Sequence, residues 1–144
     1  LALGSIISSL IEEEFFTVMF EEDIDYVIPI PISYKRQQER GFNQVEEILK
    51  NLNYSYLTGK RIKNTKKMCK IYDKNKREKN IKDSFYFGKD LSGKNILIFD
   101  DIITTGATIR EFVEELEKKG KFNKIVVFSL SVGKTYLKPD KRMC

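Results

Sequence analysis

The chain has 144 residues, a hydrophobic fraction of 41% and a formal net charge of +5, which suits one folded domain with a substantial core and excludes two ordinary domains. It contains no histidine, which excludes Ser-His-Asp and Cys-His catalysis, and its two cysteines, Cys69 and Cys144, are too few for a disulfide framework and form no CxxC pair. No apolar run reaches the ~18–20 residues of a membrane span and no secretory signal is visible, so we expect a cytoplasmic protein.

The first elements are a helix and a buried strand. Apolar residues recur at spacings of three and four over Gly4–Glu22, which predicts a helix, with Ser5 as its cap. Tyr26–Ile30 is typical of a buried strand that is stopped by Pro29 and Pro31. Since the chain begins with leucine and not methionine, we expect residues 1–144 to be a single domain taken from a longer protein that continues upstream.

The middle of the chain is more polar. Ser33–Phe42 is expected to be a cationic loop, and Asn43 is expected to cap a short helix over Gln44–Leu49. Weak alternation over Tyr54–Ile62 predicts a strand, and Ser84–Phe87 is expected to be another short strand. The stretch between these two predicted strands has almost no apolar periodicity, so we expect a functional loop or disorder there.

The clearest strand is Asn95–Phe99, and an amphipathic helix with Phe112 and Leu116 on one face follows it. Gly120 is expected to cap the end of that helix, and Lys124–Leu130 is the next strand. The order strand–helix–strand predicts an α/β fold with a parallel sheet and right-handed crossovers.

The link between the clearest strand and its helix has the composition of an anion site. Asp100 and Asp101 follow the strand, and a short turn rich in hydroxyl groups leads into the helix. The first turn of a helix offers unpaired N–H groups and a positive dipole, which suit a phosphate monoester. Two carboxylates at the carboxyl end of a strand can bind sugar hydroxyls and help to hold Mg²⁺. The alternative is an ordinary strand–turn–helix whose polar residues only cap the helix. The expected phosphate ligands are Thr104, Thr105, Gly106, Ala107 and Thr108.

Ile96–Thr108 resembles the ribose-5-phosphate loop of type I phosphoribosyltransferases: four apolar residues, two acids, two apolar residues and a Thr-Thr-Gly turn. The resemblance implies that Asp100 and Asp101 hold the ribose 2′- and 3′-hydroxyls and that residues 104–108 bind the 5′-phosphate. It also implies a ligand, 5-phosphoribosyl-1-pyrophosphate, and a cofactor, Mg²⁺.

A second pair of motifs, Ile28–Ser33 and Glu39–Gln44, resembles the ComF-type phosphoribosyltransferases associated with bacterial competence. The resemblance extends from about Ile24 to Leu130 and implies a central parallel sheet with flanking helices, a small hood and a long mobile loop. For the run Arg40–Gln44 a functional role is favoured; the alternative is that Tyr34–Arg40 is a solvated loop and that Asn43 and Gln44 only cap a helix. The residues expected to contact the pyrophosphate are Ser33, Lys35, Arg36 and Arg40. The three cations among them would neutralise the negative charge that grows on the leaving group.

Residues 60–82 concentrate the positive charge, with eleven Lys or Arg and two acids. Arg61, Lys63 and Thr65 resemble the start of the family's mobile catalytic loop, which implies that Arg61 and Lys63 act on the diphosphate. Met68 departs from a glutamine common in relatives, and Lys63 from an arginine, which leaves the fine chemistry of the loop open. A solvated loop and a nucleic-acid contact are the alternatives.

The resemblance therefore implies a transferase that moves the phosphoribosyl group to an unidentified acceptor, expected to be a nitrogen nucleophile, with release of pyrophosphate. Two alternatives stay open: a non-catalytic sensor of a phosphoribosyl ligand, and a competence factor that binds single-stranded DNA through residues 60–82. A protein of the competence machinery as partner and a homo-oligomer also stay open, since no residue pattern decides between them.

Overall fold

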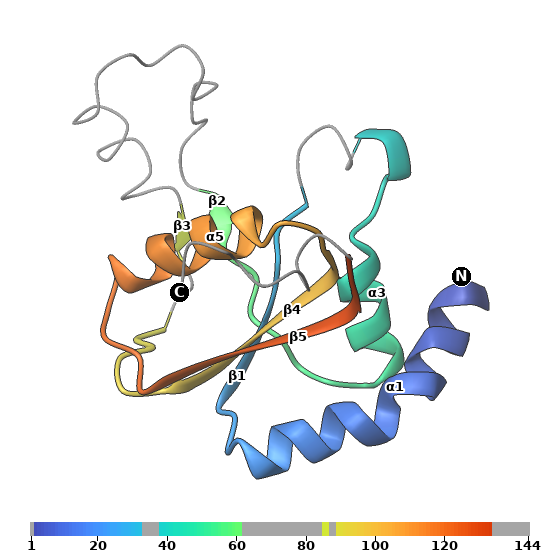
Figure 1. The fold of residues 1–144 in the computed structure, drawn as a ribbon, viewed down its shortest axis with the longest axis horizontal. Helices are drawn as coiled ribbons and strands as arrows, with labels where there is room; N and C mark the ends of the chain where they lie inside the picture. The colour runs from blue at the N-terminus through green and yellow to red at the C-terminus, as the bar shows by residue number, and fades with distance from the viewer. Residues whose placement is uncertain (1, 33–37, 62–84, 87–88, 134–144) are drawn as a thin grey trace, which may run out of the picture.

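The computed structural model describes residues 2–32, 38–61, 85–86 and 89–133. Its centre is a parallel sheet of three strands, β1 (Tyr26–Pro29), β4 (Asn95–Ile103) and β5 (Lys124–Val132), in the spatial order β1-β4-β5 (Figure 1). The pairs β1–β4 and β4–β5 are both parallel, with Ile28 opposite Ile98 and Phe99 opposite Phe128. The predicted α/β fold with a parallel sheet is confirmed.

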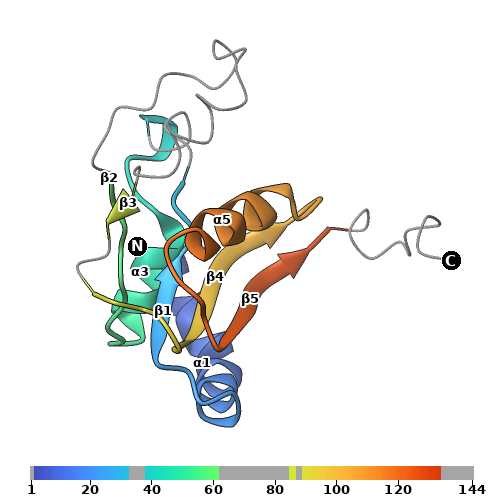
Figure 2. The ribbon, with the colours of Figure 1, turned by 90° about the vertical axis from the view of Figure 1, so that its left-hand side faces the viewer.

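Helices cover both faces of this sheet (Figure 2). On one face lie α1 (Ala2–Glu21) and α3 (Gln44–Asn51), and on the other lies α5 (Ala107–Glu117). The side chains of β4 alternate between the two layers, because successive residues of a strand point to opposite faces. Leu97 and Phe99 pack with the first layer, and Ile96 and Ile98 pack with the second.

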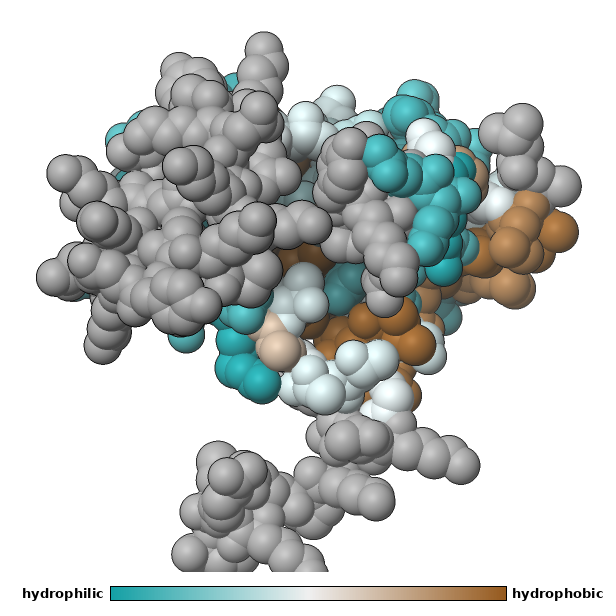
Figure 3. Space-filling model, turned by 90° about the horizontal axis from the view of Figure 1, so that it is seen from above, coloured by the Kyte–Doolittle hydropathy of each residue, from teal (hydrophilic) through white to brown (hydrophobic). Residues whose placement is uncertain are grey.

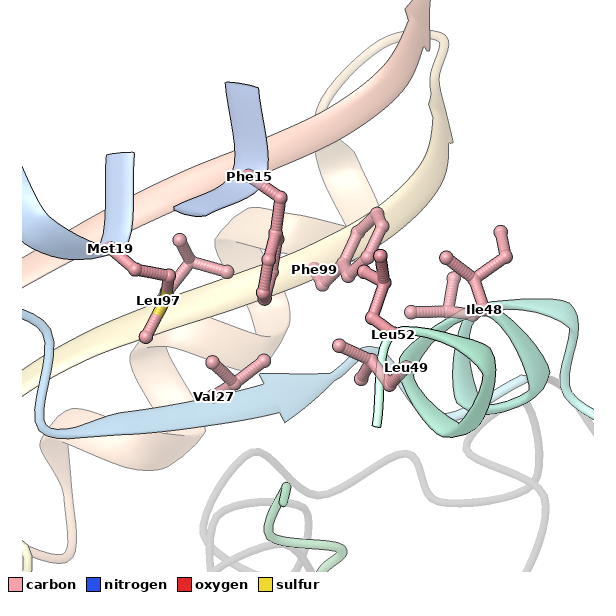
Figure 4. Close-up of a cluster of buried hydrophobic side chains, with 9 residues drawn as sticks. Phe15, Met19, Val27, Ile48, Leu49, Leu52, Leu97 and Phe99 are labelled. Carbon is pink, nitrogen blue, oxygen red and sulfur yellow. The ribbon is translucent and has the colours of Figure 1, made fainter. Parts of the chain in front are cut away.

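The larger of the two buried clusters lies between α1, α3 and the sheet (Figure 4). Phe15 of α1 is its centre, with no exposed surface. Its ring meets those of Tyr54, Phe99 and Phe128 at centroid distances of 5.4, 6.0 and 5.7 Å. Burial in this cluster raises the pKa of the Tyr54 phenol. These contacts fix α1 and α3 against the strands whose ends carry the candidate site.

A second sheet has two short antiparallel strands, β2 (Lys60–Arg61) and β3 (Phe85–Tyr86). The strand predicted over Tyr54–Ile62 is therefore wrong for most of its length, while the one predicted over Ser84–Phe87 is confirmed at its centre. The backbone of residues 54–59 bonds instead to neighbouring elements: Tyr54 N donates to Leu49 O at 3.0 Å and Leu57 N to Val27 O at 2.9 Å. These two amides therefore bond to α3 and β1 instead of to a paired strand.

Three predicted boundaries also differ. Helix α1 begins at Ala2, so Ser5 lies inside it and does not cap it. Helix α5 ends at Glu117 with Lys118 as its cap in a right-handed conformation, so Gly120 is not the cap. Strand β4 does not stop at Phe99 but continues through both aspartates to Ile103, because its pairing with β5 persists to the end.

None of the helices in the part of the chain that the structure describes has the length and hydrophobicity required to cross a membrane.

Candidate functional site

A pocket of about 250 Å³ opens at the edge of the sheet where β1 and β4 end, and α3 and α5 begin beside it. Figure 3 looks down onto this edge of the molecule, where polar and hydrophobic surface lie side by side. Five residues expected from the sequence to bind the ligand line the pocket, and they come from two separate segments of the chain. They are Arg40, Asp100, Asp101, Thr104 and Thr108.

The two aspartates sit near the end of β4, half-buried. One carboxylate oxygen of each accepts a backbone N–H from the next residue: Asp101 N donates to Asp100 Oδ1 at 2.9 Å, and Ile102 N donates to Asp101 Oδ1 at 2.8 Å. These bonds orient both carboxylates, and a carboxylate has about four acceptor positions in all. Carboxylates oriented in this way are the groups that vicinal hydroxyls or a hydrated cation would need as acceptors.

The turn after β4 leads directly into α5. Gly106 precedes α5 with φ at +75° and ψ at +4°, a left-handed conformation that residues with a side chain rarely adopt. Gly106 is the N-cap of α5 and provides no side-chain cap, but Thr105 Oγ1 accepts the N–H of Ala107, the first residue of the helix, at 3.3 Å. Arg110 closes the outer side of the turn by donating from Nη1 to Thr105 O at 3.1 Å. Thr104 and Thr108 line the pocket, whereas Thr105, Gly106 and Ala107 form the turn beside it.

One charged contact crosses the pocket. Arg40 Nη1 lies 3.9 Å from Asp101 Oδ2, and their side chains are 51% and 24% exposed. An ion pair with this exposure contributes little to stability, because water screens it and both side chains lose freedom. Arg40 is therefore held beside the carboxylates by a weak contact, from which a stronger anion can draw it.

The side chain of Asn43 connects two segments that line the pocket. It caps α3 by accepting from Val45 N at 3.1 Å, as the sequence predicts, and its amide also donates to Ile30 O at 3.1 Å. The second bond joins the end of β1 to the beginning of α3. Phe42 and Gln44, on either side, line the pocket too; the sequence favoured a functional role for the run Arg40–Gln44 but named only Arg40 as a ligand. The Arg-Gly-Phe-Asn-Gln run that carries the family resemblance was the signal available for them.

Several expected ligands lie outside the described residues. Ser33, Lys35 and Arg36 belong to this group, as does Lys63 of the basic stretch. Arg61 lies in β2, but only its backbone is described. The structure therefore brings the acidic pair, the phosphate turn and Arg40 together, and the remaining cationic ligands stay predictions.

The donor set fits Mg²⁺ bound together with a phosphorylated substrate. The described residues contain no cluster of three or more His, Cys, Asp or Glu that could hold a metal ion alone. Mg²⁺ usually keeps several waters and takes only one or two carboxylates, with substrate phosphates as the other ligands. Asp100 and Asp101 match that smaller contribution.

Substitution of Gly106 tests the turn. We expect Gly106→Val to lower the free energy of unfolding by about 1–2 kcal/mol, because a β-branched residue is strained at positive φ. It should also weaken the binding of ribose 5-phosphate, since relief of the strain moves the amides of the first turn. Gly106→Asn is the matched control, because asparagine tolerates the left-handed region. Urea unfolding and calorimetric titration measure the two effects, and equal behaviour of both variants would contradict a required left-handed residue.

Comparison with known proteins agrees with this architecture. A family model described as PRTase-CE matches residues 3–140. The chain belongs to the PRTase-CE family. Competence protein ComFC of Bacillus subtilis is 32% identical over 118 residues, covering 80% of this chain and 48% of that protein. Competence protein ComFC of Streptococcus pneumoniae is 34% identical over 119 residues, covering 77% and 52%. The predicted membership of the ComF family is thereby confirmed.

Among solved structures, a hypoxanthine phosphoribosyltransferase from Staphylococcus aureus superposes with a TM-score of 0.51 at 14% identity, covering 93% of this chain and 67% of that one. At this identity the likeness concerns the fold alone, and it agrees with the predicted type I phosphoribosyltransferase-like fold. The PRTase-CE chain spans about half the length of the curated relatives that it matches.

Proposed function

We propose that this phosphoribosyltransferase-like protein binds 5-phosphoribosyl-1-pyrophosphate with Mg²⁺ and transfers the phosphoribosyl group to an acceptor. The observation that carries the proposal is the pocket itself, which gathers Asp100, Asp101, Thr104, Thr108 and Arg40. The ligand has three parts, and the pocket offers a group for each. The carboxylates suit the ribose hydroxyls, the threonines suit the 5′-phosphate, and the cation suits the diphosphate.

Each group has a task in the reaction. The carboxylates of Asp100 and Asp101 accept hydrogen bonds from the ribose hydroxyls and fix the sugar ring, so that positioning lowers the barrier. The hydroxyls of Thr104 and Thr108, with the amides that begin α5, bind the 5′-phosphate. Arg40 leaves its weak contact with Asp101 and turns toward the diphosphate, whose negative charge grows as it departs.

The bonds exchanged are those at ribose C1. A nitrogen of the acceptor forms a bond to C1, the bond from C1 to the diphosphate oxygen breaks, and the electron pair leaves with pyrophosphate. Water takes the proton that the acceptor loses, so no histidine is needed. Mg²⁺, when bound, neutralises part of the charge on the diphosphate.

Calorimetric titration with 5-phosphoribosyl-1-pyrophosphate and Mg²⁺ tests the binding step. We expect one binding site per chain, with affinity that falls when Mg²⁺ is omitted. Absence of heat under both conditions would contradict the proposal. A screen of nitrogen acceptors for pyrophosphate release then separates an enzyme from a sensor, because a sensor binds the ligand and releases no pyrophosphate with any acceptor.

The eleven cations of residues 60–82 favour a second candidate, contact with single-stranded nucleic acid. Neutralising Lys66, Lys67 and Lys70 should then lower the affinity for a single strand and reduce its dependence on salt. Weak binding that these changes leave unaltered would remove this candidate and would not affect the first.

A further inference from the structure

Helix α1 has hydrophobic side chains on both of its faces. One face packs against the sheet through residues such as Ile11, Phe15 and Met19. On the opposite face Leu3, Ile6, Leu10 and Phe20 are 62%, 56%, 71% and 88% exposed. A helix on the surface of a folded domain normally keeps its apolar residues on the face toward the core, so a second, exposed apolar row is unusual. In the described part of the chain no element covers this second face, and hydrophobic surface shows on the right of Figure 3, the side on which α1 begins in Figure 1.

The spacing of the exposed row is that of a helix-pairing seam. Positions 3, 6, 10, 13, 17 and 20 alternate steps of three and four residues, which is the period of a coiled-coil contact. Four of these positions hold the exposed apolar residues, and Glu13 and Thr17 hold the other two. An apolar row with this period fits another helix laid along α1.

The charges around the row are all of one sign. No lysine or arginine occurs between Ala2 and Glu21. Glu14 and Glu21 fall on one side of the row at positions that face the flanks of a partner helix, and Glu12 falls on the other side. In the C-terminal half of the helix, the side chains of Phe16 and Phe20 form a shallow surface beside those of Glu12, Glu13 and Glu21. Such a surface suits the aliphatic stem and cationic head of a lysine or arginine.

A second copy of this chain fits the row poorly. In either orientation of two α1 helices, all the charged side chains at the contact are acidic. Like charges disfavour pairing. We propose that the outer face of α1 is a docking surface for a cationic amphipathic helix of a partner protein, with apolar residues against the row and Lys or Arg against Glu13, Glu14 and Glu21. The C-terminal half of α1, with Phe20 and Glu21, lies at the end of the sheet opposite the pocket (Figure 1).

Synthetic helical peptides of 21 residues test the surface on the full chain. The first carries Leu and Ile at the seam positions and Lys on both flanks, the second carries Glu on the flanks, and the third is a scrambled form of the first. We expect the Lys peptide to bind at least tenfold more tightly than the other two, by fluorescence anisotropy. Leu10→Ser with Phe20→Ser should weaken it at least tenfold, and Glu14→Lys with Glu21→Lys should reverse the preference toward the Glu peptide.

Three results would overturn the proposal. The first is equal binding of the Lys and Glu peptides, and the second is binding of the Lys peptide that neither pair of substitutions alters. The third is a native dimer in sedimentation equilibrium that Leu10→Ser with Phe20→Ser converts to monomer, because the surface would then belong to a second copy. Circular dichroism of each variant confirms that the exposed substitutions leave the fold intact.

Discussion

Replacing Asp100 and Asp101 together by asparagine is expected to lower the affinity for 5-phosphoribosyl-1-pyrophosphate with Mg²⁺ by about 100-fold. Hydrogen bonds to charged groups contribute about 1.5–3 kcal/mol each, and both substitutions remove the negative charge and place an N–H₂ donor where the hydroxyls or the cation need an acceptor. Calorimetric titration of the native and doubly substituted chains gives the ratio directly.

The matched control for this prediction is Glu111→Gln with Glu114→Gln. These two glutamates are exposed on α5 outside the pocket, and their substitution changes the net charge by the same amount. The control should bind as the native chain does, because both side chains are exposed, and water and salt screen charges at the surface. Equal affinities of the native chain and the Asp100/Asp101 variant would remove the acidic pair from the site.

Phe15→Ala is expected to lower the free energy of unfolding by about 3–5 kcal/mol, the typical cost of removing a buried aromatic ring and leaving a cavity. The ring is fully buried and contacts three other aromatic rings from α1's neighbours. Because the free energy of unfolding of a domain is only about 5–15 kcal/mol, this change should remove a large part of it. Urea unfolding followed by circular dichroism measures the loss.

Phe20→Ala on the same helix is the control for the same chemical change, since Phe20 is 88% exposed. Its effect should stay within about 0.5 kcal/mol, as for most surface substitutions. A similar loss for both variants would mean that α1 does not pack on the sheet through Phe15.

Local sequence patterns predicted those helices and strands that can be recognised from their own residues. The apolar run Asn95–Phe99 predicted β4, and the row of Phe112 and Leu116 predicted α5. The acidic pair and the threonine turn were found because they lie next to each other in the chain. In contrast, the extension of β4 to Ile103 depends on pairing with β5, which no local pattern reports. The strand expected over Tyr54–Ile62 failed for the same reason, because its backbone groups bond to α3 and β1.

The long-range contacts within the site could not be predicted from the sequence either. The bond from Asn43 to Ile30 O joins residues thirteen positions apart, and Arg40 meets Asp101 across sixty residues. Sequence patterns give residue types and not the distances between segments, so the role of Asn43 in joining β1 to α3 emerged only from the fold. The run Arg40–Gln44 was expected to be functional, but Phe42 and Gln44 were not named as ligands, because an apolar and an amide side chain beside a helix cap have many ordinary explanations.

The most direct test is a crystal structure of this chain with 5-phosphoribosyl-1-pyrophosphate and Mg²⁺. We predict density with the 5′-phosphate at the Thr104–Thr108 turn and the ribose hydroxyls on Asp100 and Asp101, with Arg40 turned toward the diphosphate. A well-ordered ligand bound elsewhere on the molecule, with this pocket filled only by water, would contradict the account.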